Sequence, residues 1–349
     1  MSAVTRSLPT GVNQRHADAP DYTLTSYGVW VDVPGGPPAV IVDEVFDGDR
    51  HDHAAAPMST ASAIVRSARP LQWTKNLLVF AAPGAAGVLD DWPELGAALL
   101  AFVAFCLASS GIYLWNDALD VHADRRHPTK RFRPVAAGQL GVGTAKAAGT
   151  VLLVAACAVA AGTGRWQTVA VVVTYIVATI AYSAWLKHVA VVDLVLVASG
   201  FVLRAAAGAV AVDVPMSKWF VLCTVFGSLF IVAGKRYAEL REIGAGAGDV
   251  RPTLETYTPT YLRGVLTMSC GAAIISYCLW ALETKELAGT DLPFYELSIV
   301  PMLTAMLRYL LLIEQGHGGA PEEVFANDRV LQLLGVLWVV TFGLGVYSA

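Results

Sequence analysis

The sequence predicts an all-α, polytopic membrane protein, and three observations support that prediction. Of its 349 residues 55% are apolar and only 15% are charged, whereas a soluble domain has about 25% charged residues. Its mean hydropathy is +0.54, and apolar runs close to the ~20 residues that cross a bilayer recur along the chain. Lysine and arginine gather between alternate runs, which is the pattern that the positive-inside rule describes.

The first sixty residues differ from the rest. They carry a net charge of −5, whereas residues 61–349 carry +1, and neither part has the basic charge that binds nucleic acid. No basic stretch leads into an apolar run, so we predict no signal peptide. Alternating apolar residues in 27–46 are compatible with a short strand. We favour a disordered cytoplasmic tail over 1–60, because it cannot bury enough apolar area, and a transmembrane catalytic domain over 61–349.

The segment after residue 60 is predicted to approach the bilayer as an amphipathic helix. Trp73 suits the interface between lipid and water, and Arg66, Arg69 and Lys75 mark the cytoplasmic side. Five cysteines lie singly in apolar runs and are predicted to be buried and unpaired.

Nine apolar segments are candidates for spanning helices. The first is short and contains Pro83 and Gly84, so we expect it to be kinked or to extend back through Trp73. The nine segments are Leu77–Leu89, Leu95–Trp115, Thr144–Ala161, Thr168–Leu186, Val189–Val212, Trp219–Ala233, Leu262–Leu282, Leu297–Ile313 and Val330–Tyr347.

The basic residues set the orientation of these segments. With the N-terminus inside, the cytoplasmic loops lie around 116–142, 187–188, 234–261 and 314–329, and they hold nearly all lysines and arginines of the body. Only Arg165, Lys218 and Lys285 fall on the other side. We therefore predict a multi-pass protein of the plasma membrane whose active site faces the cytoplasm.

An aspartate-rich stretch follows the second segment. Asp117, Asp120 and Asp124 are spaced i, i+3 and i+7, which places them on one stripe of a helix. Three converging carboxylates repel one another unless a cation lies between them. Mg²⁺ is the expected cation, because it takes carboxylates and leaves positions for phosphate oxygens. The alternative is the solvated, charged end of a membrane helix.

Cationic residues near this stretch are candidates for holding a polyanionic ligand. Lys130, Arg131 and Arg133 follow it directly. Tyr182 and Lys187 form a second cluster, for which the alternative is an interface anchor. Three more residues, Lys235, Arg236 and Glu239, have the spacing to face one cavity, and a snorkelling helix end is the alternative.

Arg204 lies at membrane depth, where a guanidinium is costly and usually faces a cavity or a partner. Asp193 is eleven residues earlier and therefore on the same face of a helix. The alternative to a ligand contact is a structural bond to a backbone or carboxylate group.

These motifs resemble those of the UbiA superfamily of intramembrane prenyltransferases. The resemblance covers residues 65–349, and its most specific part is Asn116-Asp117-x-x-Asp120-x-x-x-Asp124. Within the superfamily the chain is most similar to the decaprenyl-phosphate phosphoribosyltransferases of mycobacteria and corynebacteria. That similarity rests on Arg69-Pro70-x-Gln72-Trp73-x-Lys75-Asn76, His127-Pro128-Thr129-Lys130-Arg131 and Pro321-Glu322-Glu323-Val324-Phe325.

One departure from the superfamily affects the expected substrate. Most members carry a second D-x-x-x-D motif after the sixth helix, and this chain has Lys235-Arg236-Tyr237-Ala238-Glu239 there. That replacement disfavours an aromatic prenyltransferase and fits a donor that carries a 5-phosphate as well as a pyrophosphate.

The resemblance implies a UbiA-like bundle with a central cavity open to the cytoplasm. It implies Mg²⁺-dependent transfer of 5-phosphoribosyl from phosphoribosyl pyrophosphate (PRPP) to decaprenyl phosphate, which gives the lipid precursor of cell-wall arabinan. The alternatives are a UbiA-type aromatic prenyltransferase using a polyprenyl pyrophosphate and, from another class, a transporter or lipid-binding scaffold. Whether the chain forms a homo-oligomer stays open. The catalytic and metal-binding candidates are Asn116, Asp117, Asp120 and Asp124, and the substrate-binding candidates are Lys75, Asn76, Asn116, Lys130, Arg131, Arg133, Tyr182, Lys187, Arg204, Lys235, Arg236 and Glu239.

Overall fold

The computed structural model describes residues 22–25, 28–31, 39–41, 58–127, 129–243, 252–316 and 321–348. Contacts divide the chain into two units, Met1–Pro57 and Met58–Ala349. The first contains a small antiparallel sheet of β1 (Tyr22–Thr25), β2 (Gly28–Val31) and β3 (Ala39–Ile41), in the order β1-β2-β3. Strands β2 and β3 fall in the stretch that alternates apolar residues. The rest of the predicted disordered tail up to residue 57 lies outside the described residues.

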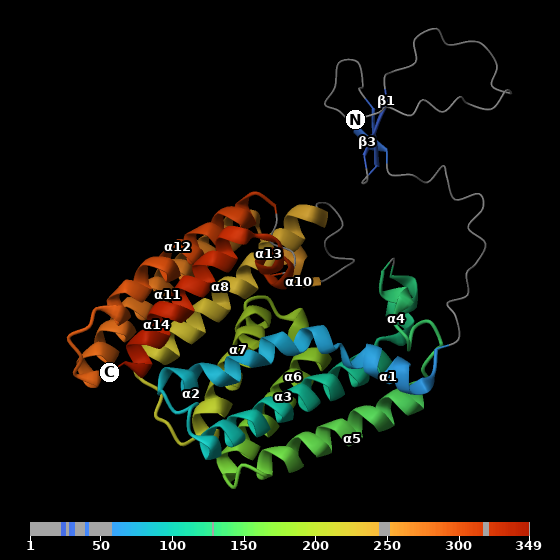
Figure 1. Cartoon of the computed structure of the whole chain (residues 1–349). Helices are drawn as coiled ribbons and strands as arrows, with labels where there is room; N and C mark the ends of the chain where they lie inside the picture. The colour runs from blue at the N-terminus through green and yellow to red at the C-terminus, as the bar shows by residue number, and fades with distance from the viewer. Residues whose placement is uncertain are drawn as a thin grey trace, which may run out of the picture. The chain divides into compact units, whose positions relative to one another are not determined.

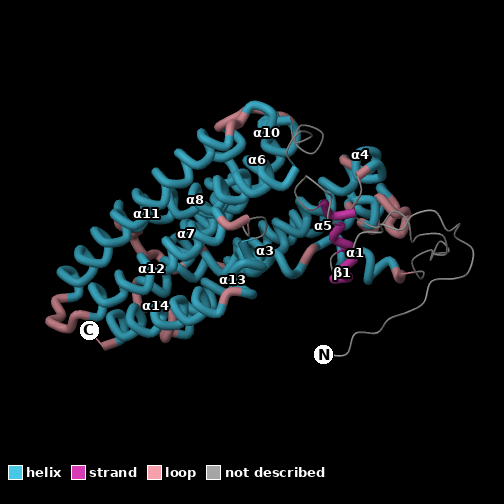
Figure 2. The backbone as a smooth tube through the Cα atoms, turned by 90° about the horizontal axis from the view of Figure 1, so that it is seen from above, coloured by secondary structure: helices cyan, strands magenta, loops and turns pink. Residues whose placement is uncertain are grey.

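The second unit is a bundle of helices (Figures 1 and 2). Eight helices in the described ranges are long and apolar enough to cross a membrane. They correspond to the second to ninth predicted segments, and they are α3 (Trp92–Leu119), α5 (Val142–Ala161), α6 (Trp166–Ala184), α7 (Val192–Ala211), α8 (Lys218–Ile243), α11 (Pro259–Ala288), α12 (Phe294–Glu314) and α14 (Arg329–Tyr347). Shorter elements connect them: α4 (Val121–Arg126), η2 (Lys130–Phe132), η3 (Leu186–His188), α10 (Pro252–Thr256) and α13 (Pro321–Asn327).

The first predicted span differs from an ordinary membrane helix, so the count of nine is not confirmed. Helix α1 (Thr60–Ala68) ends at Arg69 in the left-handed region, with φ 54°, and a 3₁₀ helix, η1 (Pro70–Phe80), follows. The short helix α2 (Ala81–Ala85), which contains Pro83, completes the segment. It therefore does extend back through Trp73 as expected. A 3₁₀ helix of eleven residues is uncommon, because its hydrogen-bond geometry is poorer than that of an α-helix.

Helix α7 lies at the centre of the bundle. It packs against α3, α6, α8 and η1, and its residues contribute to two separate apolar cores. Gly208 allows the contact with η1, since a Cβ at that position would lie 1.7 Å from the carbonyl oxygen of Val79. The lack of a side chain at Gly208 therefore allows η1 to pack directly against α7.

Helix α8 continues beyond the point where the sequence analysis placed a loop. The predicted span ended at Ala233, with a loop over 234–261, but the helix extends to Ile243. The added turns contain good helix formers such as Ala238, Leu240 and Arg241, which continue a helix into solvent readily. Lys235 and Arg236 are therefore held on a rigid helix.

Candidate active site

The aspartate-rich stretch folds as two helices joined at Asp120. Helix α3 ends at Leu119, Asp120 has φ −88° and ψ 8°, and α4 begins at Val121. The backbone hydrogen bonds from Asp120 N to Asn116 O and from Asp124 N to Asp120 O keep the chain close to helical across this kink. Aspartate side chains compete for backbone groups and favour helix ends, which accounts for the position of the break.

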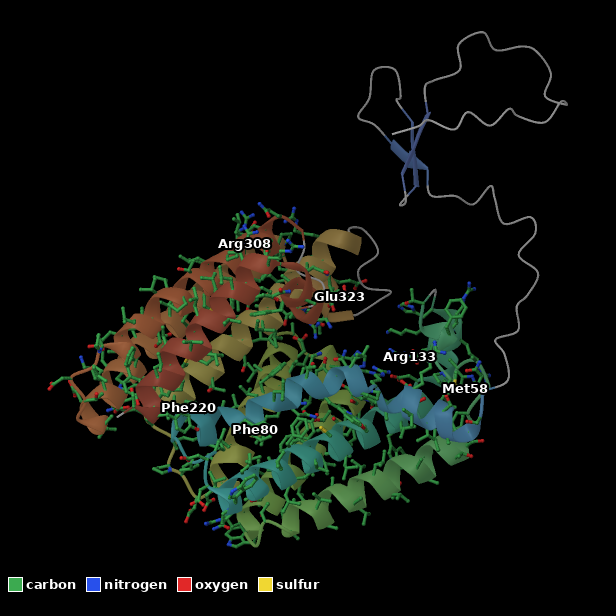
Figure 3. All side chains as sticks on the ribbon, viewed as in Figure 1. Met58, Phe80, Arg133, Phe220, Arg308 and Glu323 are labelled. Carbon is green, nitrogen blue, oxygen red and sulfur yellow. The ribbon has the colours of Figure 1, made fainter. Side chains whose placement is uncertain are left out.

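Two of the three predicted carboxylates come together, and two arginines hold them. The Asp117 side chain is 1% exposed, and its Oδ1 accepts hydrogen bonds from Arg69 Nη2 at 2.6 Å and from Arg133 Nη1 at 3.3 Å. The same Arg133 nitrogen donates to Asp124 Oδ2 at 2.7 Å. Arg133 lies beside α4 in Figure 3. The paired acids are thus joined through one guanidinium.

Asp120 lies apart from this pair. Its side chain is 46% exposed, and Lys187 Nζ from η3 lies 3.9 Å from its Oδ1. In the described ranges no three acidic, histidine or cysteine side chains converge on one point, which differs from the three-carboxylate convergence that the helical spacing predicts. The chain leaves regular helical geometry at Asp120, which changes the position of Asp124 relative to α3, and Asp120 itself lies beside Lys187.

The side chains of Asp117 and Asp124 nevertheless fit a bound Mg²⁺. Asp117 Oδ2 is buried and has no hydrogen-bond partner among the described residues. A buried carboxylate oxygen without a partner is costly, and a bound cation removes that cost. Mg²⁺ is typically bound through one or two carboxylates, with waters and substrate phosphates as its other ligands. The donor set at Asp117 and Asp124 fits that description.

A cavity of about 800 Å³ lies between η1, α6, α7, α8 and α13. Lys75, Lys235 and Arg236 contribute three cations to its wall, together with the hydroxyl of Tyr182, and no acidic residue is among its described lining. Such a wall attracts anions. Sequence reasoning assigned all four residues to substrate binding, and the fold brings them to one cavity from three separate segments.

Two smaller compartments adjoin this cavity, and Lys75 and Phe201 line all three. One, the polar compartment, has a volume of about 260 Å³ and is lined by polar side chains such as Asn116, Tyr182 and Arg204 together with apolar ones. The other, of about 630 Å³, is lined almost entirely by apolar and aromatic side chains of η1, α2, α8, α11, α12 and α14. A cavity with three cations on its wall therefore lies next to a compartment with an apolar lining.

Arg204 faces the polar compartment, but protein groups take its nitrogens. Nε donates to Asn76 Oδ1 at 2.7 Å, Nη1 to the carbonyl oxygen of Gly200 at 2.7 Å, and Nη2 to Tyr175 Oη at 3.1 Å. Its guanidinium also lies over the rings of Phe105, Tyr175 and Phe201. Asp193, which shares a face of α7 with Arg204, is not among these partners and binds Arg236. These contacts favour a structural role for Arg204, with Asn76 as one of its hydrogen-bond partners.

Replacing Arg204 by lysine tests that reading. Lysine keeps the charge but loses the planar set of donors, so we expect the free energy of unfolding in detergent to fall by about 3 kcal/mol. The measurement is thermal unfolding, with Arg329→Lys at an exposed position as the control. If the melting temperature is unchanged and pyrophosphate binds more weakly, Arg204 instead contacts the substrate.

Arg236 is held by two carboxylates. Its Nε lies 3.4 Å from Asp193 Oδ2, and its Nη1 lies 2.9 Å from Glu239 Oε2. Asp193 also accepts hydrogen bonds from Tyr257 Oη and Thr253 Oγ1. Glu239 is outside the described lining of the cavity, so its place is that of a partner to Arg236.

The basic loop after α4 contributes no residue to the described lining of the three compartments. Arg131 is exposed and lies over the ring of Phe132, and Lys130 is half-buried on η2. His127 Nδ1 accepts the backbone N–H of Thr129, and burial, followed by the charge of Lys130, lowers the pKa of its imidazole. The ring is therefore neutral at pH 7, and it stabilises the turn that follows α4 by accepting this hydrogen bond. Pro128 of the same motif lies outside the described residues.

Comparison with known proteins now decides the family. The model of the UbiA prenyltransferase family matches residues 77–334. The chain belongs to this family. Eight helices among the described residues are long and apolar enough to cross a membrane, and with this family's fold the chain is an integral membrane protein.

Several relatives and solved structures are similar to this UbiA chain. The decaprenyl-phosphate phosphoribosyltransferase of Mycolicibacterium smegmatis is 44% identical over 84% of this chain and 95% of its own length. The protein of that name from Mycobacterium tuberculosis is 45% identical over 83% and 96%. A UbiA homologue from Archaeoglobus fulgidus, solved bound to GPP and Mg²⁺, matches with a TM-score of 0.62 and 19% identity over 82% of this chain and all of that chain. That last match bears on the fold alone.

Three residues of the site were not among the candidates from sequence. Arg69 was read as an orientation signal and part of a motif, and the structure places it on Asp117. Asp193 was noted only for sharing a helix face with Arg204, and it binds Arg236. Tyr257 carried no signal, because a tyrosine after a short polar helix is common and its contact with Asp193 spans 64 residues.

Proposed function

We propose that this UbiA protein transfers the 5-phosphoribosyl group of PRPP to decaprenyl phosphate and releases pyrophosphate. The observation that carries the proposal is the cavity whose charged lining consists of Lys75, Lys235 and Arg236, beside an apolar compartment. A donor with a 5-phosphate and a pyrophosphate, and an acceptor with one phosphate, need fixed cations in addition to a metal site. The names of the relatives at 44–45% identity support the same substrates.

Mg²⁺ is the proposed cofactor, held by Asp117 and Asp124, and Asn116 and Asp120 are the further candidates from the motif. When bound, it neutralises charge that develops on departing pyrophosphate. Arg69 and Arg133 keep the two buried carboxylates in place. The Mg²⁺ in the A. fulgidus homologue supports a metal in this family.

The reaction that we propose needs no general base. An oxygen of the acceptor phosphate bonds to C1 of the ribose, and the bond from C1 to the pyrophosphate oxygen breaks, with the electron pair leaving on pyrophosphate. The acceptor phosphate is already an anion at neutral pH, so no proton has to be removed. The side chains therefore serve to hold and orient the pyrophosphate, the 5-phosphate and the acceptor phosphate. We assign this role to Lys75, Tyr182, Lys235 and Arg236, which line the cavity, and to Lys187, which lies 3.9 Å from Asp120.

The apolar compartment is the proposed place for the start of the prenyl chain. Its aromatic wall includes Phe220, Trp280 and Phe342, and Figure 3 shows Phe220 well away from Arg133. Burying an isoprenoid among such rings is favourable by roughly 25 cal/mol per Å². We further propose that the large cavity and the polar compartment face the cytoplasm. The basic segments 127–133 and 234–241 lie at the same end of the bundle, and basic segments favour the cytoplasmic side of a membrane.

A transfer assay tests the proposal. Membranes containing the protein are given PRPP labelled in the ribose, with and without decaprenyl phosphate and with and without EDTA. We expect label in the lipid phase only when the acceptor is present and EDTA is absent. Pyrophosphate release from a polyprenyl pyrophosphate and an aromatic acceptor, with none from PRPP, would instead support the aromatic prenyltransferase.

Lys235→Ala gives a sharper prediction. Lys235 lies on the cavity wall and contributes uniform binding to a phosphate, so we expect the KM for PRPP to rise about tenfold while kcat changes by less than about threefold. Lys218→Ala, at the opposite end of the same helix, is the control. Equal kinetics for the two variants would remove Lys235 from the donor site.

A further inference from the structure

A buried hydrogen-bond network connects α7, α8 and the segment that contains α10. Asp193 is fully buried in the first turn of α7. Its Oδ1 accepts the Tyr257 hydroxyl, and its Oδ2 faces Arg236 Nε and Thr253 Oγ1, each at 3.4 Å. Burial, and then the bond to Asp193, raise the pKa of Tyr257, so its phenol stays protonated and donates at neutral pH. Hydrogen-bond donors from α8 and from the segment around α10 therefore converge on this one carboxylate.

The network restricts the guanidinium of Arg236. Nε is directed to Asp193 and Nη1 to Glu239, which fixes the plane of the group at two points. No described residue accepts a hydrogen bond from Nη2. Nη2 is not among the fully buried polar atoms without a partner, so protein atoms do not enclose it completely. Since Arg236 lines the large cavity, Nη2 is the nitrogen that an anion in the cavity can reach. A planar group held at one edge offers its other edge in a single direction.

The same tyrosine holds the turn that leads into α7. Val191 has φ +70°, which is rare for a β-branched residue, and its N–H donates to Tyr257 Oη. Strained backbone of this kind persists only where surrounding contacts enforce it, and it concentrates at functional sites. The turn follows η3, where Lys187 approaches Asp120. Tyr257 thus fixes two cationic parts of the site at once.

We propose that Asp193 and Tyr257 are positioning residues, which aim Arg236 at a phosphate group of the donor in the cavity. Neither residue is among the described lining of the three compartments, so they act through Arg236 and the 186–191 turn. The inference rests on the proposed function for the identity of the donor. The geometry of the network stands for any phosphate or diphosphate ligand.

Tyr257→Phe tests the proposal, because it removes only the hydroxyl. We expect the KM for PRPP to rise about tenfold with kcat nearly unchanged, and the thermal stabilisation by inorganic pyrophosphate to weaken in parallel. Tyr261→Phe is the matched control, since Tyr261 stacks on Tyr257 at 5.7 Å between ring centroids but is 42% exposed. A KM within twofold of wild type, or a loss of kcat and melting temperature with KM unchanged, would overturn the positioning role.

Two further measurements keep the test decisive. Thr253→Val removes the second hydroxyl on Asp193 and should raise the same KM by a smaller factor, which covers the case that Tyr257→Phe does not fold. In an Asp193→Asn background, Tyr257→Phe should add little, because both changes break one network. If wild type transfers nothing from PRPP, the proposed function fails, and the pyrophosphate stabilisation then judges the positioning role by itself.

Discussion

Asp117→Asn is expected to reduce the turnover of phosphoribosyl transfer by about a thousandfold or more. The substitution keeps the shape of the side chain but removes the charge that faces Arg69, Arg133 and the proposed Mg²⁺. Losses of two to three powers of ten accompany the removal of a single preorganised electrostatic contact elsewhere, and a metal ligand at the leaving group should matter at least as much. The measurement is the rate at saturating PRPP and saturating Mg²⁺.

The control for this variant lies at the other end of the same helix. Asp91 precedes α3, is exposed, and makes no capping bond, so Asp91→Asn should keep wild-type turnover. Breaking a buried ion pair also costs about 3–5 kcal/mol of stability, so the melting temperature in detergent has to be measured for each protein. A folded Asp117→Asn protein that retains Mg²⁺-dependent turnover within tenfold of wild type would refute the assignment.

Gly208→Ala is expected to prevent assembly of the bundle. The added methyl group would lie 1.7 Å from the carbonyl oxygen of Val79 and 3.2 Å from Cδ of Pro83. Backbone cannot move aside as a flexible side chain can, so η1 would have to leave α7. Overpacking by one methyl in an ordinary core costs about 1–3 kcal/mol, and a clash with backbone should exceed that. We expect little folded protein in detergent, measured by size-exclusion chromatography and thermal unfolding.

Two glycines on other helices provide matched controls for that substitution. A Cβ at Gly96 on α3 or Gly271 on α11 would meet nothing within 4 Å, so alanine there should be tolerated and should favour the helix slightly. Gly234→Ala is the intermediate case, because the nearest atom is the far end of the Ile313 side chain. Equal stability of Gly208→Ala and Gly96→Ala would show that the contact between α7 and η1 is looser than described.

The sequence alone predicted the class of protein and most of its elements. Apolar runs of membrane length have one stable solution in lipid, since a helix satisfies its own backbone hydrogen bonds, and eight of the nine predicted spans are such helices. Pro83 and Gly84 marked the remaining one as irregular. Lys75, Tyr182, Lys235 and Arg236 were also identified from sequence, because a charged or polar group next to an apolar run needs a reason to be there.

Only the tertiary structure decided which charges meet. Helical spacing put Asp193 and Arg204 on one face of α7 but did not give the partner of either. The packing of α7 against α8 pairs Asp193 with Arg236, and Asn76 from η1 binds Arg204. Spacing along one helix reports which residues share a face, but the partner across that face depends on crossing helices that local sequence does not encode. Asp120 likewise lies beside Lys187 from η3, whereas Asp117 and Asp124 share Arg133. Composition and periodicity thus determined the helices and the kinds of residue in the site, while contacts over long sequence distances selected the pairs.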